Sequence, residues 1–111
     1  MKSRVLKSDW DRVADAACEV VNAVMMDDPV LSASKRERLM DLLDELERKY
    51  GERAIIAATR GDFLEDLLEA RKCLERALEL AIAEKDSDEE LEIGDSLKQL
   101  DLRATDHVSD G

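Results

Sequence analysis

Histidine, cysteine and glycine are scarce in this sequence, and their scarcity removes several classes of functional site. The single histidine, His107, lies near the carboxyl end, while the two cysteines, Cys18 and Cys73, lie far from it along the chain. Nucleophilic catalysis needs a thiol or hydroxyl beside a base, and a His/Cys metal site needs several such ligands together. The four glycines form no phosphate-binding loop. We therefore expect no catalytic residue, no metal site and no cofactor, and we predict that the protein is not an enzyme.

Long apolar runs and aromatic residues are also missing. No segment approaches the ~18 consecutive apolar residues of a membrane-spanning helix, and the first ten residues lack the apolar core of a signal peptide. We therefore expect a cytoplasmic protein in which Cys18 and Cys73 are reduced, partly buried thiols. The only aromatic residues are Trp10, Tyr50 and Phe63, so the core must be aliphatic.

Charge is abundant and mostly negative. The 111 residues carry 28 acidic and 17 basic side chains, a formal net charge of −11. Residues 84–111 hold ten acidic and three basic side chains, so they account for −7 of that total. Binding to phosphate needs clustered Lys and Arg, and this balance argues against nucleic acid or an anionic membrane surface as a partner. It is compatible with a basic protein partner, but solubility alone is the simpler explanation, and we favour it.

Helix starts are indicated by four capping-box patterns, in which a Ser or Asp is followed three residues later by an acid. These pairs are Ser8 with Asp11, Ser34 with Glu37, Asp62 with Glu65, and Ser87 with Glu90. Apolar residues recur at three- and four-residue steps after each one, which is the period of a helix with one buried face. Together with the turn residues, the patterns predict helices over about 9–26, 35–50, 52–60, 63–84 and 88–102.

The apolar stripes predict the core. The first helix should bury Trp10, Val13, Ala17, Val20, Val21 and Val24, and the centre of the core should include Leu43 and Leu74. The run 54–58 is apolar throughout and suits a buried strand or a buried helix, but no second strand exists for it to pair with, so we predict a helix. Gly51 and Gly61 should end the second and third helices. The pair Met25–Met26 suits an adaptable contact patch or the end of the core stripe, and we favour the core.

These elements predict an all-α fold, a small bundle of about five helices stacked as antiparallel hairpins. Residues 1–103 should form a single helical domain. Residues 104–111 have no helical pattern and should form a disordered tail.

The segment 51–86 resembles a tetratricopeptide-type helical hairpin. The resemblance is carried by the second helix of the pair, where small and large residues alternate in the family's manner at Ala70, Leu74, Ala77, Leu78 and Ala81. The first helix departs from the family: its Trp, Leu, Gly and Tyr positions hold Ala54, Ala57, Ala58 and Gly61, and the closing Pro position holds Ile82. A second copy of the repeat does not occur one period away in either direction.

The resemblance implies a helical module that binds another protein, or a copy of itself. Its partner-facing positions on the first helix would be Glu52, Thr59 and Asp62, although ordinary solvated residues explain these positions more simply. The alternative function is that of a small acidic inhibitor, such as an immunity protein or antitoxin, which neutralises a basic partner by charge.

Overall fold

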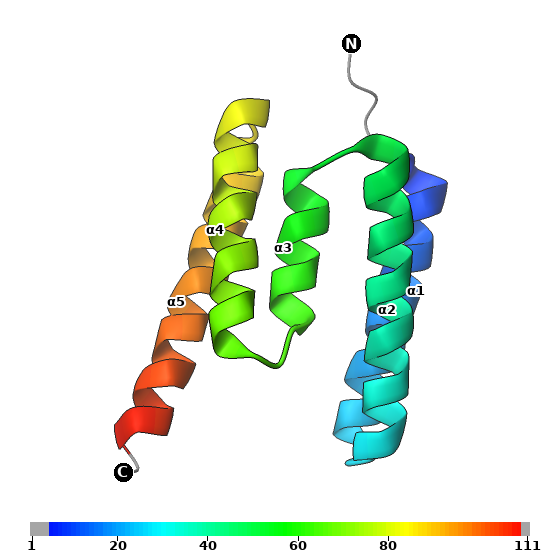
Figure 1. The fold of residues 1–111 in the computed structure, drawn as a ribbon, viewed down its shortest axis with the longest axis vertical. Helices are drawn as coiled ribbons and strands as arrows, with labels where there is room; N and C mark the ends of the chain where they lie inside the picture. The colour runs from blue at the N-terminus through cyan, green and yellow to red at the C-terminus, as the bar shows by residue number, and fades with distance from the viewer. Residues whose placement is uncertain (1–4, 110–111) are drawn as a thin grey trace. The chain divides into compact units, whose positions relative to one another are not determined.

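The computed structural model describes the backbone of residues 5–109 and the side chains of residues 5–103. Helices are the only regular secondary structure in that part of the chain, which confirms the all-α class. They are α1 (Lys7–Met25), α2 (Pro29–Tyr50), α3 (Ala54–Phe63), α4 (Leu67–Glu84) and α5 (Ser87–Ser109) (Figure 1). Where the sequence predicts one domain over 1–103, the chain divides into two compact units, unit 1 (Met1–Gly51) and unit 2 (Glu52–Gly111).

Unit 1 is an antiparallel hairpin in which α1 packs against α2 (Figure 1). The buried residues of α1 recur at steps of three and four, as one face of a helix requires. They are Val13, Ala16, Val20 and Ala23, and those of α2 are Ser32, Leu39, Leu43 and Leu46. Leu43 is fully buried, as predicted.

Unit 2 contains three helices, with α4 packed against both α3 and α5 (Figure 1). Its core is built mostly of small residues, which let the helix axes approach closely. The buried members are Ala54, Ala57, Ala58, Ala70, Leu74, Ala77, Ala81, Ile93 and Leu100. The apolar run 54–58 is helical, as predicted, and Leu74 is 1% exposed. The α3–α4 pair is therefore a helical hairpin, while its membership of the tetratricopeptide family stays a prediction.

All four predicted capping boxes are wrong. Ser8 and Ser34 lie inside α1 and α2, Asp62 lies in the last turn of α3, and Ser87 is already helical. A Ser or Asp followed three residues later by an acid also occurs within helices, because that spacing places two polar residues on the same exposed side.

Aspartates one to six residues away from the predicted caps start three of the helices instead. The Asp28 carboxylate accepts a hydrogen bond from Leu31 N–H (3.0 Å), and Pro29 provides the first residue of α2. Asp66 accepts from the N–H groups of Leu68 and Glu69 at the start of α4 (2.9 and 3.1 Å), and Asp86 accepts from Glu89 N–H at the start of α5 (3.1 Å). Each satisfies amides that the first turn of a helix leaves without an intrahelical partner.

Two glycines show why local pattern alone is ambiguous. Gly51 ends α2 as predicted: its φ is +80°, and its N–H donates to Glu47 O (2.8 Å). Gly61, by contrast, does not end α3, which continues to Phe63. It lies inside the helix at a point where a Cβ atom would stand only 2.8 Å from Cγ of Leu74. Glycine is required there by packing rather than by the backbone angle.

The last helix is longer than its pattern predicts. α5 extends to Ser109, where the sequence indicates a helix ending near Leu102 and a disordered tail over 104–111. Among the side chains of this helix that the structure describes, the buried ones are Ile93 and Leu100. The side chains of residues 104–109, including His107, and the whole of residues 110–111 lie outside the described part of the chain.

Candidate functional site

The three residues predicted to face a partner each make a hydrogen bond within unit 2. The Glu52 carboxylate accepts two hydrogen bonds from the Arg76 guanidinium (3.0 and 2.8 Å), so the two planes meet side by side. The Thr59 hydroxyl donates to Ile55 O in the preceding turn of α3 (2.8 Å). Asp62 is hydrogen-bonded to Ser96 of α5. Their role in partner binding stays a prediction, and a partner would have to compete with these contacts.

Asp62 also belongs to a group of carboxylates whose other four members lie close together in the sequence, within residues 84–92, so the fold contributes only Asp62 to the group. This acidic cluster draws on α3, α4, α5 and the turn before α5, and its members are Asp62, Glu84, Asp86, Glu89 and Glu92. Burial raises the pKa of Glu89 to about 7, with further contributions from the negative charges of the other four. Burial and the charge of Glu92 likewise raise the pKa of Asp62, while its hydrogen bond with Ser96 acts in the opposite direction.

Glu84 has a second role at the edge of the acidic cluster. One of its carboxylate oxygens accepts a hydrogen bond from Ala54 N–H, the first residue of α3, at 2.9 Å. The last residue of α4 thereby caps the start of α3 from a distance of 30 positions along the chain. A carboxylate at that place also interacts favourably with the positive end of the α3 dipole.

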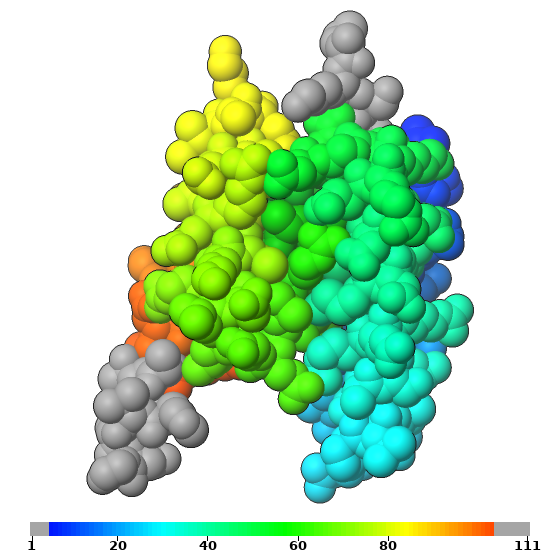
Figure 2. Space-filling view, in the orientation of Figure 1, coloured from blue at the N-terminus to red at the C-terminus, as the bar shows by residue number. Residues whose placement is uncertain are grey.

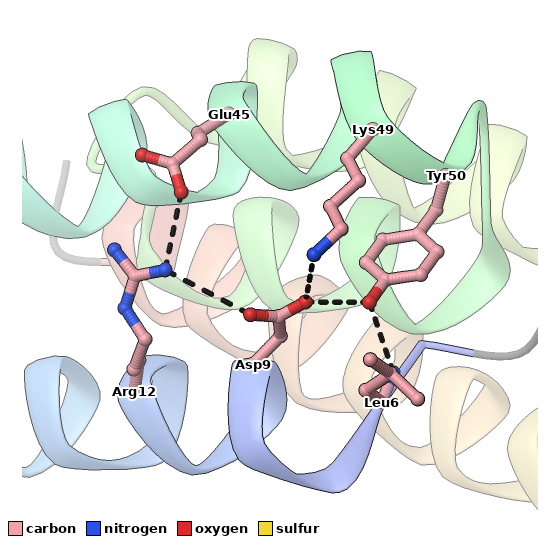
Figure 3. Close-up of polar contacts among 6 residues, drawn as sticks. All are labelled: Leu6, Asp9, Arg12, Glu45, Lys49 and Tyr50. Carbon is pink, nitrogen blue, oxygen red and sulfur yellow. Dashed lines mark hydrogen bonds and ion pairs between the residues drawn. The ribbon is translucent and has the colours of Figure 1, made fainter.

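In unit 1, a polar network joins the start of α1 to the end of α2 (Figure 3). The Asp9 carboxylate accepts a hydrogen bond from the Tyr50 hydroxyl and one from Lys49 Nζ (2.9 Å). The Tyr50 hydroxyl in turn accepts from Leu6 N–H (3.2 Å), just before the first turn of α1. The hydrogen bond from Tyr50 and that from Lys49 hold the pKa of Asp9 below its usual value.

Arg12 extends this network along the hairpin. Its guanidinium lies 3.1 Å from the Glu45 carboxylate of α2 and 3.8 Å from that of Asp9 (Figure 3). Further along, Lys35 Nζ of α2 pairs with Glu19 of α1 at 2.6 Å. Apart from the Arg12–Asp9 pair, which lies within α1, these contacts join one helix of unit 1 to the other, so we assign them to holding the hairpin together.

The opposite end of the hairpin exposes apolar side chains. We call this surface the hairpin tip, and its exposed fractions are Val21 46%, Val24 54%, Met25 78%, Met26 66% and Val30 80%. Figure 2 shows this end of unit 1 at the surface, in light blue and cyan. The prediction that Val21, Val24 and the two methionines belong to the core stripe is wrong. α1 instead buries the stripe that contains Val13, Ala16, Val20 and Ala23, which turns the tip residues toward solvent.

The turn that carries the hairpin tip is held by its own backbone. Met26 N–H donates to Asn22 O (3.0 Å), Asp27 N–H to Val24 O (3.0 Å) and Asp28 N–H to Ala23 O (3.2 Å). Asp27 has a φ of +57°, the left-handed conformation that Asp adopts more readily than most residues. The apolar side chains are therefore presented on an ordered turn.

Both cysteines are thiols, Cys18 exposed on α1 and Cys73 half-buried on α4. The expectation that both are partly buried is thus wrong for Cys18, whose face of α1 points away from α2.

Within the described residues, His, Cys, Asp and Glu form no group of three or more that could hold a metal ion. Nor does any described helix combine the length and the apolar character needed to cross a membrane. Comparison of the chain with protein-family models, curated proteins and solved structures finds no match.

Proposed function

We propose that this protein is a non-enzymatic helical module that binds another protein, and that the hairpin tip is its principal contact surface. The observation that carries the proposal is the exposure of five large apolar side chains within ten residues of sequence at one end of unit 1. Isolated exposed apolar residues are common on soluble proteins, but a contiguous group of them is a frequent mark of an interaction site.

The chemistry of the hairpin tip suits a protein surface. Met25 and Met26 have flexible, polarisable side chains that adapt to the shape of an apolar partner. Burying one such side chain contributes roughly 1.5–3 kcal/mol to association before the costs of ordering. Those costs are reduced here, because the backbone of the turn is already fixed by hydrogen bonds at residues 26–28.

The proposal is tested by photo-crosslinking in the cells from which the sequence comes. A photoreactive amino acid replaces Met26, and the matched control carries it at Leu91, an equally exposed apolar residue of unit 2 (71% exposed). We expect mass spectrometry to identify a protein that is crosslinked from position 26 and not from position 91. Equal, unselective crosslinking from both positions contradicts the assignment of the tip.

A second candidate function, inhibition of a basic protein, is supported by the acidic cluster. Its five carboxylates lie close enough for four of them to raise the pKa of Glu89, so the fold concentrates negative charge that a cationic partner could neutralise. Such a partner should associate rapidly and lose affinity steeply with salt. If the protein crosslinked from position 26 in the first experiment also binds a Glu89→Gln, Glu92→Gln variant unchanged, this second function is excluded for that partner.

A further inference from the structure

We propose that the hairpin tip accepts a basic amphipathic helix of a partner protein. The apolar face of that helix covers the Met and Val side chains, and its lysines or arginines lie beside Asp27 and Asp28. This inference deepens the proposed function and rests on it, because it specifies the chemistry of the partner that the same surface binds.

Charge complementarity carries the inference. Between Glu19 and Lys35 the only charged residues are Asp27 and Asp28, so the apolar side chains of the hairpin tip have carboxylates as their only charged neighbours in sequence. Both aspartates are exposed. α1 has no basic residue in its last turn, so the partial negative charge at its carboxyl end is not offset by its own side chains.

The two aspartates are also available to a partner. Oδ1 of Asp28 accepts the Leu31 N–H, and a carboxylate has acceptor capacity for further donors. The Asp27 backbone N–H donates to Val24 O, and the backbone hydrogen bonds that hold the turn do not involve the Asp27 carboxylate. A lysine or arginine beside the apolar face of a helix suits this surface. Its aliphatic stem packs against the exposed Val and Met side chains, while its charged end pairs with an aspartate.

Other occupants are disfavoured by the same charges. Two copies of the chain meeting at their tips would bring four aspartates together, in a protein whose net charge is already −11. An anionic bilayer would repel the aspartates as well, because its surface potential attracts lysine and arginine. Recognition of the apolar face of an amphipathic helix by a complementary apolar surface is an established mode of peptide binding.

The test is a nuclear magnetic resonance titration of the full chain with three synthetic helical peptides. The first contains leucine and lysine in an amphipathic pattern. The second has the same leucines with glutamate in place of lysine, and the third has the same lysines with serine in place of leucine. We expect the leucine–lysine peptide to shift amide signals centred on residues 21–31, and the other two peptides to bind at least about tenfold more weakly.

Variants separate the apolar and the charged contributions. Met25→Gln with Met26→Gln keeps side-chain length, and we expect it to weaken binding of the leucine–lysine peptide about tenfold or more. Asp27→Asn tolerates the same backbone angle, and we expect a loss of about threefold, the size of an exposed ion pair. The matched controls are Leu91→Gln and Asp15→Asn, which remove an exposed apolar side chain and an α1 charge elsewhere, and they should leave the affinity unchanged.

Several results would overturn the inference. Equal binding of the leucine–glutamate peptide at residues 21–31 refutes the charge preference, and leaves the proposed function standing because the tip still binds an apolar face. Amide shifts centred on the acidic cluster would show that the basic helix binds there and not at the hairpin tip. The absence of shifts at residues 21–31 would show that the tip does not bind a basic helix. Sedimentation experiments could instead show self-association, or vesicle experiments could show binding to anionic lipid. If either is lost in the Met25→Gln, Met26→Gln variant, the tip binds a second copy of the chain or a membrane surface and not a basic helix. The crosslinking experiment at position 26 tests the proposed function independently of partner charge.

Discussion

Gly61 and Gly94 both lie inside helices, but only Gly94 has room for a side chain in place of its hydrogen. A Cβ at Gly61 would lie 2.8 Å from Leu74 Cγ and 3.2 Å from the backbone oxygen of Ala70, and neither atom can move easily because Leu74 and Ala70 are both buried. A Cβ at Gly94 would meet no atom within 4 Å. The same substitution should therefore have opposite signs at the two positions.

We expect Gly61→Ala to lower the free energy of unfolding by about 1–3 kcal/mol, since the cost of overpacking exceeds the gain in helix propensity. Gly94→Ala should raise it by about 0.5–1 kcal/mol, the ordinary advantage of Ala over Gly in a helix. Urea denaturation of both variants measures the difference. A stabilised Gly61→Ala variant would show that α3 and α4 do not approach as closely as described.

Tyr50 stabilises unit 1 through Asp9, and this contribution depends on pH. The hydrogen bond from Tyr50 lowers the pKa of Asp9 in the folded protein, so the folded state binds its proton less readily than the unfolded state does. The associated stability is present above the ordinary Asp pKa of 3.8 and is lost as the pH falls through the lowered value.

We therefore expect Tyr50→Phe to destabilise the protein near neutral pH, and the difference from the wild type to shrink in acid as Asp9 becomes protonated. The Leu6 N–H contact of Tyr50 is also lost, but that loss is independent of pH. A double-mutant cycle with Asp9→Asn, carried out at neutral pH and in acid, isolates the pH-dependent coupling. Coupling of the same size at both pH values would argue against the Tyr50–Asp9 hydrogen bond.

Among the elements, α5 begins in the most acidic surroundings. Glu89 in its first turn has a pKa of about 7 because of burial and neighbouring carboxylates, against an ordinary value of 4.5. Between those values the folded state binds more protons than the unfolded state, so the stability of unit 2 should fall as the pH rises from about 4.5 to 7.

Glu89→Gln removes this titration. We expect the variant to gain stability over the wild type as the pH rises from 4.5 toward 7, and to match it in acid below 4.5. Glu90→Gln is the control, since it removes the same charge from the same first turn and so reproduces the loss of favourable helix-dipole interaction. Thermal unfolding followed by circular dichroism at several pH values measures both. A pH dependence that is identical in the Glu89→Gln variant and the wild type would contradict the raised pKa.

At the scale of the whole molecule, the division of the chain at Gly51 makes a prediction about folding. The nine buried residues of the α3–α4–α5 core all belong to unit 2. We therefore expect the fragment 52–111 to be helical in isolation and to unfold in one cooperative transition.

Leu74→Ala tests whether the isolated fragment uses the same core. The substitution should destabilise the fragment by about 2–5 kcal/mol, the range for a buried leucine, and this loss should equal that in the full chain. Leu80→Ala, at a half-buried position beside the core, is the control and should cost less. A fragment that shows no cooperative transition, or that is indifferent to Leu74→Ala, would show that unit 2 needs the rest of the chain to fold.

The sequence by itself determined the helices of this protein. The three- and four-residue periods identified α1, α2, α4, α5 and the central leucines Leu43 and Leu74, because a helix with one buried face must repeat its apolar residues at that spacing. Gly51 marked the end of α2 as a helix-terminating glycine. Even the ambiguous run 54–58 was assigned correctly, since a strand needs a partner strand and the sequence contains none.

Tertiary structure decided the rest. α1 carries two overlapping apolar stripes, and only packing against α2 selected the one with Val20 and Ala23, leaving Val21, Val24 and both methionines to form the hairpin tip. Contacts between residues distant in sequence, such as Glu84 with Ala54 and Tyr50 with Asp9, could not be predicted either, because no sequence pattern relates the two partners. The period of a helix shows that one face is buried, but which of two adjacent faces is buried depends on the shape of the neighbouring helix.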